Sequence, residues 1–174
     1  MTPFCFEHVF RADSVDDVFA AYFDADQQRD QDRATDIAQR DVLELAEKDD
    51  EVRRVCRVVP RRQLPALVRP LVAGQLHYIE HVTWNRRADR MEMDIRPSLL
   101  GGRVQILGTY RLERISDNEI RRTYEGQVSV DIALLASRIE RGIVAELDKT
   151  MPIAAACTQA WLDRRAQVDQ RARA

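Results

Sequence analysis

The sequence predicts one α+β domain in which antiparallel strands pack against helices, and three observations support this fold class. The segment from Ala133 to Arg165 carries apolar residues at nearly helical period, so it predicts one long amphipathic helix. Five earlier segments, Phe4–Phe10 and four between Gln75 and Ile132, alternate apolar and polar residues with the period of two that is typical of strands, and two further segments read as a hairpin. A short amphipathic segment follows the first of them. Antiparallel strands with helices on one face form an α+β sandwich.

The N-terminal region predicts a strand followed by a capped helix. Phe4–Phe10 places aromatic residues at alternate positions, which indicates a strand. Ser14 is a good N-cap with Asp17 three residues on, and the residues after it have helical apolar spacing. From Asp24 to Asp36 the chain is polar and lacks an apolar face, so we expect a short exposed helix or a loop there.

The remaining strands are predicted in two groups. Ile37–Glu47 and Val52–Val59 read as a hairpin around the turn residues 48–50. A run joined by short turns then predicts an antiparallel meander: Gln75–Arg86, Arg90–Arg96, Arg103–Ile115 and Glu119–Ile132. Gly108 and Gly126 interrupt the apolar faces of the last two strands, which indicates a bend or the close approach of another group.

Between these groups lies Pro60–Gly74, which has apolar residues at helical spacing and basic residues around them. Pro65 and Pro70 limit any helix there to a turn or two. Two interpretations stay open: a short helix packed over the sheet edge, or a lid whose basic rim makes transient contact with a membrane surface or a partner.

The predicted C-terminal helix is roughly 50 Å long at about 1.5 Å per residue, so its apolar stripe needs a wide curved surface. The stripe comprises Leu135, Ile139, Ile143, Leu147, Met151, Ala154, Thr158 and Trp161. Pro152 is expected to kink the helix because it removes one backbone hydrogen bond. Residues 166–174 are expected to be a frayed tail.

Composition predicts a single domain over residues 1–174 and excludes several classes of protein. The chain is 45% hydrophobic and 32% charged, as in an ordinary globular protein. A net charge of -2 argues against nucleic-acid binding, which usually requires a basic excess. Three separated cysteines, no CxxC motif and no signal peptide predict reduced thiols in the cytoplasm. The apolar runs are shorter than the roughly 20 residues of a membrane span.

The layout resembles the START/SRPBCC superfamily, whose helix-grip (birch-pollen-allergen-like) fold wraps a curved seven-stranded antiparallel sheet around a long C-terminal helix. The matching pieces are Phe4–Phe10, the helix capped by Ser14, and the strand-to-helix segment Gln127–Glu140. This segment is most similar to an uncharacterised bacterial branch, although Ala136 or Ser137 replaces its usual glycine. The resemblance implies a cavity between sheet and helix that holds lipids or other apolar molecules. It implies no particular reaction.

One sequence motif suggests a metal site, but its context argues against it. His77, Glu80 and His81 match the HxxEH pattern of zinc peptidases, which places both histidines on one helical turn. The flanking residues favour a strand, where the histidines would be roughly 13 Å apart and Glu80 would face the opposite side from His81. We therefore expect no metal and no other cofactor.

Glu80 and Arg122 are the candidate polar residues of the interior, since each lies on the apolar face of its strand. A buried charge is costly unless it is paired or hydrogen-bonded. Glu80 is then part of an ion pair or a solvated cavity edge, or it anchors the head group of a ligand.

These observations predict a binding or transport protein for a hydrophobic small molecule or lipid, monomeric or homodimeric. The expected ligand-binding residues face the space between sheet and helix: Tyr78, Glu80, Trp84, Met93, Tyr110, Arg122, Tyr124, Ile139, Ile143 and Leu147. Two alternatives stay open. One is an enzyme of cyclase, dehydratase or hydrolase type that uses an inward Glu80, and the other is a filled domain that acts through protein contacts.

Overall fold

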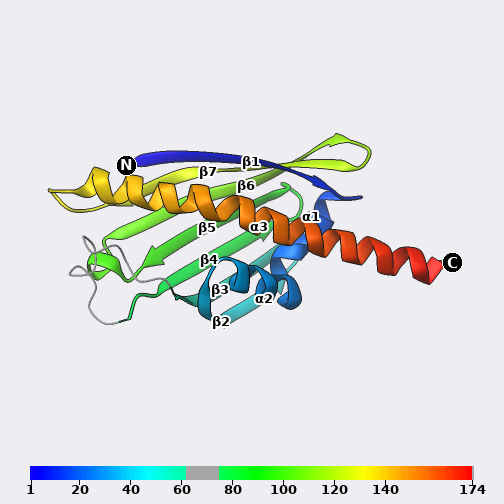
Figure 1. The fold of residues 1–174 in the computed structure, drawn as a ribbon, viewed down its shortest axis with the longest axis horizontal. Helices are drawn as coiled ribbons and strands as arrows, with labels where there is room; N and C mark the ends of the chain where they lie inside the picture. The colour runs from blue at the N-terminus through cyan, green and yellow to red at the C-terminus, as the bar shows by residue number, and fades with distance from the viewer. Residues whose placement is uncertain (62–74, 174) are drawn as a thin grey trace.

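One antiparallel sheet forms the frame of the molecule in the computed structural model, which describes residues 1–61 and 75–173 (Figure 1). Its strands are β1 (Thr2–Arg11), β2 (Ile37–Lys48), β3 (Glu51–Pro60), β4 (Tyr78–Asn85), β5 (Arg90–Pro97), β6 (Val104–Ser116) and β7 (Glu119–Val130). The helical elements are α1 (Val15–Phe23), α2 (Ala25–Ala34), the 3₁₀ turn η2 (Leu99–Gly101) and α3 (Ala136–Arg173). The predicted α+β helix-grip fold is confirmed.

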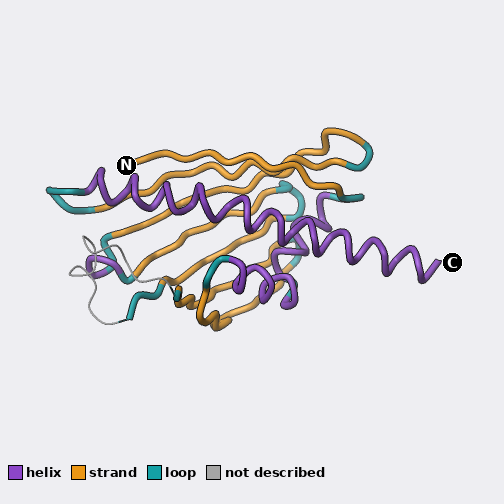
Figure 2. The backbone as a smooth tube through the Cα atoms, in the orientation of Figure 1, coloured by secondary structure: helices purple, strands orange, loops and turns teal. Residues whose placement is uncertain are grey.

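The sheet order is β1-β7-β6-β5-β4-β3-β2, so the first strand pairs with the last and β2 is left at the opposite edge. The register aligns side chains of one face across the sheet. Val82, Met93, Gly108, Gly126 and Phe4 form one such row from β4 to β1. Figure 2 shows the three helices on the same side of this sheet, and we call the side that they cover the inner face.

The predicted Ser14 cap is present at the start of α1. The Ser14 hydroxyl accepts a hydrogen bond from the Asp17 backbone N–H at 3.1 Å, which satisfies one of the free N–H groups of the first turn. Asp24 then ends α1 and caps α2, because its carboxylate accepts from the backbone N–H groups of Asp26 and Gln27 at 2.9 Å. The two short helices thus meet at one residue.

Helix α2 is more buried than its polar sequence predicts. Gln27 is only 1% exposed, and its amide donates to Gln31 at 3.1 Å and to the Thr158 hydroxyl of α3 at 3.3 Å. Gln28 is also buried. The expectation of an exposed segment is wrong for this face, because glutamines with hydrogen-bond partners can pack against another helix.

Helix α3 crosses the inner face along most of its length. It begins at Ala136, three residues after the predicted start, and continues through Pro152 to Arg173. Residues 166–173, predicted as a frayed tail, belong to the helix, and Figure 1 shows this end extending beyond the sheet. None of the helices in the described part of the chain combines the length with the apolar character that a membrane span requires.

Two inward glycines allow aromatic rings to lie against the sheet. A Cβ at Gly108 would overlap the Tyr124 ring, and a Cβ at Gly126 would overlap backbone atoms of β6 and the Phe4 ring. The prediction of close approach at these positions is confirmed. The prediction made for Pro60–Gly74 lies outside the described residues, apart from Pro60 and Arg61.

Candidate functional site

All ten residues predicted to bind a ligand lie on the inner face of the sheet or on the side of α3 that packs against it. The buried ones are Glu80, Trp84, Met93, Tyr110, Arg122, Tyr124 and Ile139. Tyr78, Ile143 and Leu147 are half-buried. The strand alternation and the helical period therefore assigned the side chains to the correct faces, but the residues divide between two ends of the interior.

The end nearest α1 is filled by aromatic rings. Tyr110 stacks on Tyr124 with ring centroids 4.2 Å apart, and Trp84 packs against Phe19 and Phe23 of α1 at 5.1 and 5.7 Å. The cavity left here measures only about 10 Å³. Trp84, Tyr110 and Tyr124 thus make core contacts in this structure.

The other end of the interior is less tightly covered. Helix α3 packs mainly against β1, β7, α1 and α2. The inward side chains of Tyr78 on β4 and Ile95 on β5 remain partly exposed, although both strands lie inside the sheet. Ile143 and Leu147, on the facing side of α3, are partly exposed as well. This pattern marks an apolar surface between the first half of α3 and β4–β5.

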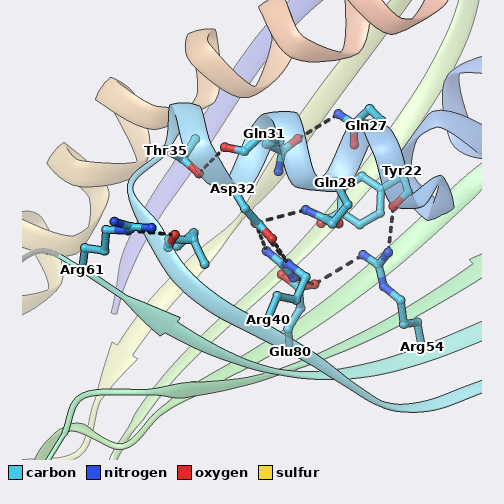
Figure 3. A network of polar contacts seen from close by, with 11 residues as sticks. Tyr22, Gln27, Gln28, Gln31, Asp32, Thr35, Arg40, Arg54, Arg61 and Glu80 are labelled. Atoms are coloured by element: carbon cyan, nitrogen blue, oxygen red, sulfur yellow. Dashed lines mark hydrogen bonds and ion pairs between the residues drawn. The ribbon is translucent and has the colours of Figure 1, made fainter.

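A buried network of charged side chains adjoins this surface (Figure 3). The Glu80 carboxylate pairs with Arg40 of β2 at 2.9 Å and lies 3.5 Å from Arg54 of β3. Arg40 also pairs with Asp32 of α2 at 3.0 Å. The side chains of Glu80, Arg40 and Arg54 are 6%, 9% and 5% exposed. Two arginines and two carboxylates give this network no net charge.

The network joins α2 to the sheet and also reaches α1. Arg54 donates to the backbone carbonyl of Tyr22 at 2.8 Å, and its guanidinium lies over the Tyr22 and Phe23 rings at 5.1 Å. Gln28 donates to the same Asp32 carboxylate that binds Arg40. Glu80 thus has the ion-paired role that the sequence left open, with partners other than Arg122.

Of the partners of Glu80 and Arg40, the sequence predicts an inward side chain for Arg54 but not for Arg40 or Asp32. Arg54 alternates with Val52, Cys56 and Val58, so the same period-two argument places it on the inner face. Arg40 has no such signal, because β2 has two register shifts, one between Ile37 and Gln39 and one between Val42 and Glu44, and Arg40 lies between them. Asp32 lies in a helix without an apolar stripe, so its inward direction depends on how α2 packs.

The electrostatics around Glu80 favour the protonated form of the neighbouring phenols. Burial, and then the negative charge of Glu80, raise the pKa of Tyr78 and of Tyr22. Burial raises the pKa of the Cys56 thiol next to Glu80 in the sheet. Burial lowers the pKa of Arg40, but Glu80 and Asp32 together raise it above its ordinary value. The Glu80 carboxylate itself contacts two arginines, Arg40 and Arg54.

The strand assignment of the HxxEH motif is confirmed. Glu80 is buried on the inner face, His81 is exposed on the outer face, and His77 precedes β4. Opposite faces of a strand cannot supply ligands to one ion.

A separate groove of about 650 Å³ lies on the outer face, away from α3. It is lined by outward side chains from β4 to β7 and β1, among them His81, Thr83, Thr109 and Cys5. Its carboxylates have arginine neighbours, as in the pairs Glu92–Arg90, Asp94–Arg96 and Glu125–Arg111. This groove is open and is not the cavity predicted between sheet and helix.

Solved structures with the same architecture share little sequence with this chain. TTHA0849 from Thermus thermophilus aligns with a TM-score of 0.65 and 10% identity over 94% of this chain and 98% of that one. The Zhui aromatase/cyclase from Streptomyces sp. R1128 has a TM-score of 0.60, 11% identity and coverage of 94% and 96%. A START superfamily protein from Mycobacterium smegmatis has a TM-score of 0.60, 8% identity and coverage of 94% and 99%.

At these identities the structural matches show the fold alone. No curated protein matches the sequence. Residues 6–162, however, match the family described as "Protein of unknown function (DUF2505)". With its seven-stranded sheet, its two short helices after β1 and its long C-terminal helix, the chain belongs to the DUF2505 family and has the START/SRPBCC helix-grip fold.

Proposed function

We propose that this protein binds a hydrophobic small molecule or lipid between the first half of α3 and the inner face of β4 and β5. One observation carries the proposal: Tyr78 and Ile95 face the helix layer from interior strands and yet stay partly exposed. A filled core would bury such side chains, since interiors are close-packed. Ile143 and Leu147 provide an apolar wall opposite them.

The polar groups at this surface favour a neutral ligand. The Glu80 network has no net charge, so it offers no free ion partner to a charged head group. The Tyr78 phenol stays protonated and supplies one hydrogen-bond donor. Affinity would come mainly from apolar burial, which contributes roughly 25 cal/mol per Å² before the costs of ordering are subtracted.

The fold is consistent with this proposal. An aromatase/cyclase and a START superfamily protein have the same architecture over nearly their whole length. For this chain we infer only that the ligand binds between the sheet and the C-terminal helix.

Mass spectrometry of the purified protein tests the proposal directly. Native spectra should show an adduct that organic extraction removes, and the extract should contain a neutral apolar molecule. Leu147→Trp fills the proposed space and should abolish the adduct, whereas Ile153→Trp should retain it, because Ile153 is an exposed residue of the same helix. No adduct in the wild-type protein, together with no binding of neutral apolar probes, would refute the proposal.

A second function, action through protein contacts, is supported by one edge of the sheet. Among the described strands, only β3 pairs with β2, which exposes Val42, Leu43 and Leu45 at 57%, 58% and 62%. Exposed apolar edge strands promote pairing with another chain. Light scattering should then show a stable dimer that Leu43→Lys dissociates, while a monomer at high concentration would count against this alternative.

A further inference from the structure

Arg122 is a buried cation without a carboxylate partner among the residues that the structure describes. It is 5% exposed and lies on the inner face of β7, at the end of the interior nearest α1. The arginines of the Glu80 network differ in this respect, because Arg40 and Arg54 are matched by Asp32 and Glu80. A buried charge with no counter-charge is strongly unfavourable.

The contacts that Arg122 does make are uncharged. Its guanidinium lies over the Phe10 and Tyr110 rings at 4.9 and 5.0 Å, and one terminal nitrogen is 3.4 Å from His8 Nδ1. Burial and the Arg122 charge lower the pKa of His8, which keeps this imidazole neutral. Within the described part of the chain, the buried Nε of Arg122 has no hydrogen-bond partner. Cation–π contacts are weak beside the cost of removing a guanidinium from water.

Arg122 lines the small cavity between α1, α3 and the sheet. The cavity measures about 10 Å³, which is close to the space that one water-sized atom requires. Tyr22 and Tyr110 also line it, and their hydroxyls donate to methionine sulfurs at 3.8 and 3.9 Å. Sulfur is a weak acceptor, so both phenols can turn to a better one. Of the described residues that line the cavity, none carries a carboxylate.

The lining therefore combines one positive charge with hydroxyl donors around a space for a single atom. We propose that this cavity is a binding site for a small monovalent anion, with chloride as the simplest occupant. The anion neutralises Arg122 and accepts hydrogen bonds from the guanidinium and the two phenols. Since the lining comes from α1, α3, β5, β6 and β7, the bound ion links both helices to the sheet.

Thermal unfolding of the full chain in sodium chloride and in sodium gluconate, at equal ionic strength, tests this site. A ligand that binds only the folded state raises the Tm. We expect a rise of roughly 2–8 °C in chloride that saturates with concentration, while gluconate is too large to enter. Arg122→Met should abolish the difference. Arg111→Met is the matched control on the exposed outer face, and it should retain the difference.

Crystals grown in sodium bromide provide a second measurement that does not require the variant to fold. An anomalous peak within hydrogen-bond distance of the Arg122 guanidinium, together with the chloride effect, would support the site. Absence of the peak would overturn the proposal. So would a peak without any stabilisation in solution, which would indicate an adventitious ion only, or a chloride effect that Arg122→Met leaves unchanged. None of these outcomes depends on whether the protein binds an apolar ligand.

Discussion

Replacing Glu80 by glutamine should destabilise the protein far more than the same change at an exposed ion pair. Glu80 is the only carboxylate that contacts Arg54 among the described residues, so Glu80→Gln leaves that guanidinium buried and unpaired. Arg40 keeps its second partner, Asp32. The perturbation therefore converts a neutral network of four charges into one with a net charge of +1.

The distances set the size of the effect. At an effective dielectric constant of about 20, unit charges about 3 Å apart attract each other by about 5 kcal/mol. The two contacts of Glu80 measure 2.9 and 3.5 Å, but desolvation of the three side chains offsets much of this attraction. Removing one partner of a buried pair typically costs about 3–5 kcal/mol, and we expect that loss in the free energy of unfolding.

Urea denaturation at neutral pH is the appropriate assay. With a slope of about 2 kcal/mol per M, the midpoint should fall by roughly 1.5–2.5 M. Glu92→Gln is the matched control, because Glu92 pairs with Arg90 on the outer face and both are well exposed, so its loss should stay below about 1 kcal/mol.

A double-mutant cycle then identifies the cause of the effect. Adding Arg54→Met to Glu80→Gln removes the uncompensated charge, so the double variant should be more stable than the sum of the single losses by about 2 kcal/mol or more. If Glu80→Gln costs no more than the control, or if the single losses add, the network contributes no buried electrostatic energy and the reasoning is refuted.

Three further predictions concern other parts of the fold. Glu140→Gln should lower the stability of the protein at neutral pH. Burial raises the pKa of Glu140, but hydrogen bonds from the N-terminus, Thr2 and Val130 lower it overall. The difference in Tm between the wild-type protein and the variant should therefore disappear as the pH falls below the ordinary carboxyl range. Gly126→Ala should destabilise the protein by about 3 kcal/mol or more, because the added Cβ overlaps backbone atoms of β6 and the Phe4 ring. Gly142→Ala, on α3 where a Cβ meets no neighbour, should stabilise the protein by about 0.5–1 kcal/mol. Equal shifts of the two urea midpoints would contradict both predictions. Burial raises the pKa of Tyr110 to about 12, so an absorbance titration of the folded protein should show this phenol still protonated above pH 10. The protein should also lose stability above pH 10, because the phenol of the unfolded chain deprotonates at a lower pH than that of the folded chain.

Local sequence patterns determined most elements and most side-chain directions. The alternation in 75–132 placed Glu80, Met93 and Tyr124 on the inner face, and Ser14 marked the start of α1. These predictions hold because period two and the N-cap depend on residues a few positions apart. Helix α3 continues through Pro152, as the predicted helix does.

Tertiary structure alone decided how the interior is divided. The partners of Glu80 come from positions 40 and 26 residues earlier, and Arg40 lies opposite the buried Val58 between the two register shifts of β2. The docking of α2 turns Asp32 and Gln27 inward, and the close approach of Tyr124 to Gly108 closes one end of the interior. A chain's local pattern fixes which face a residue occupies, but the neighbour it meets depends on strand order and helix packing over long sequence separations. The apolar surface beside Tyr78 and the unpaired charge of Arg122 are products of that packing.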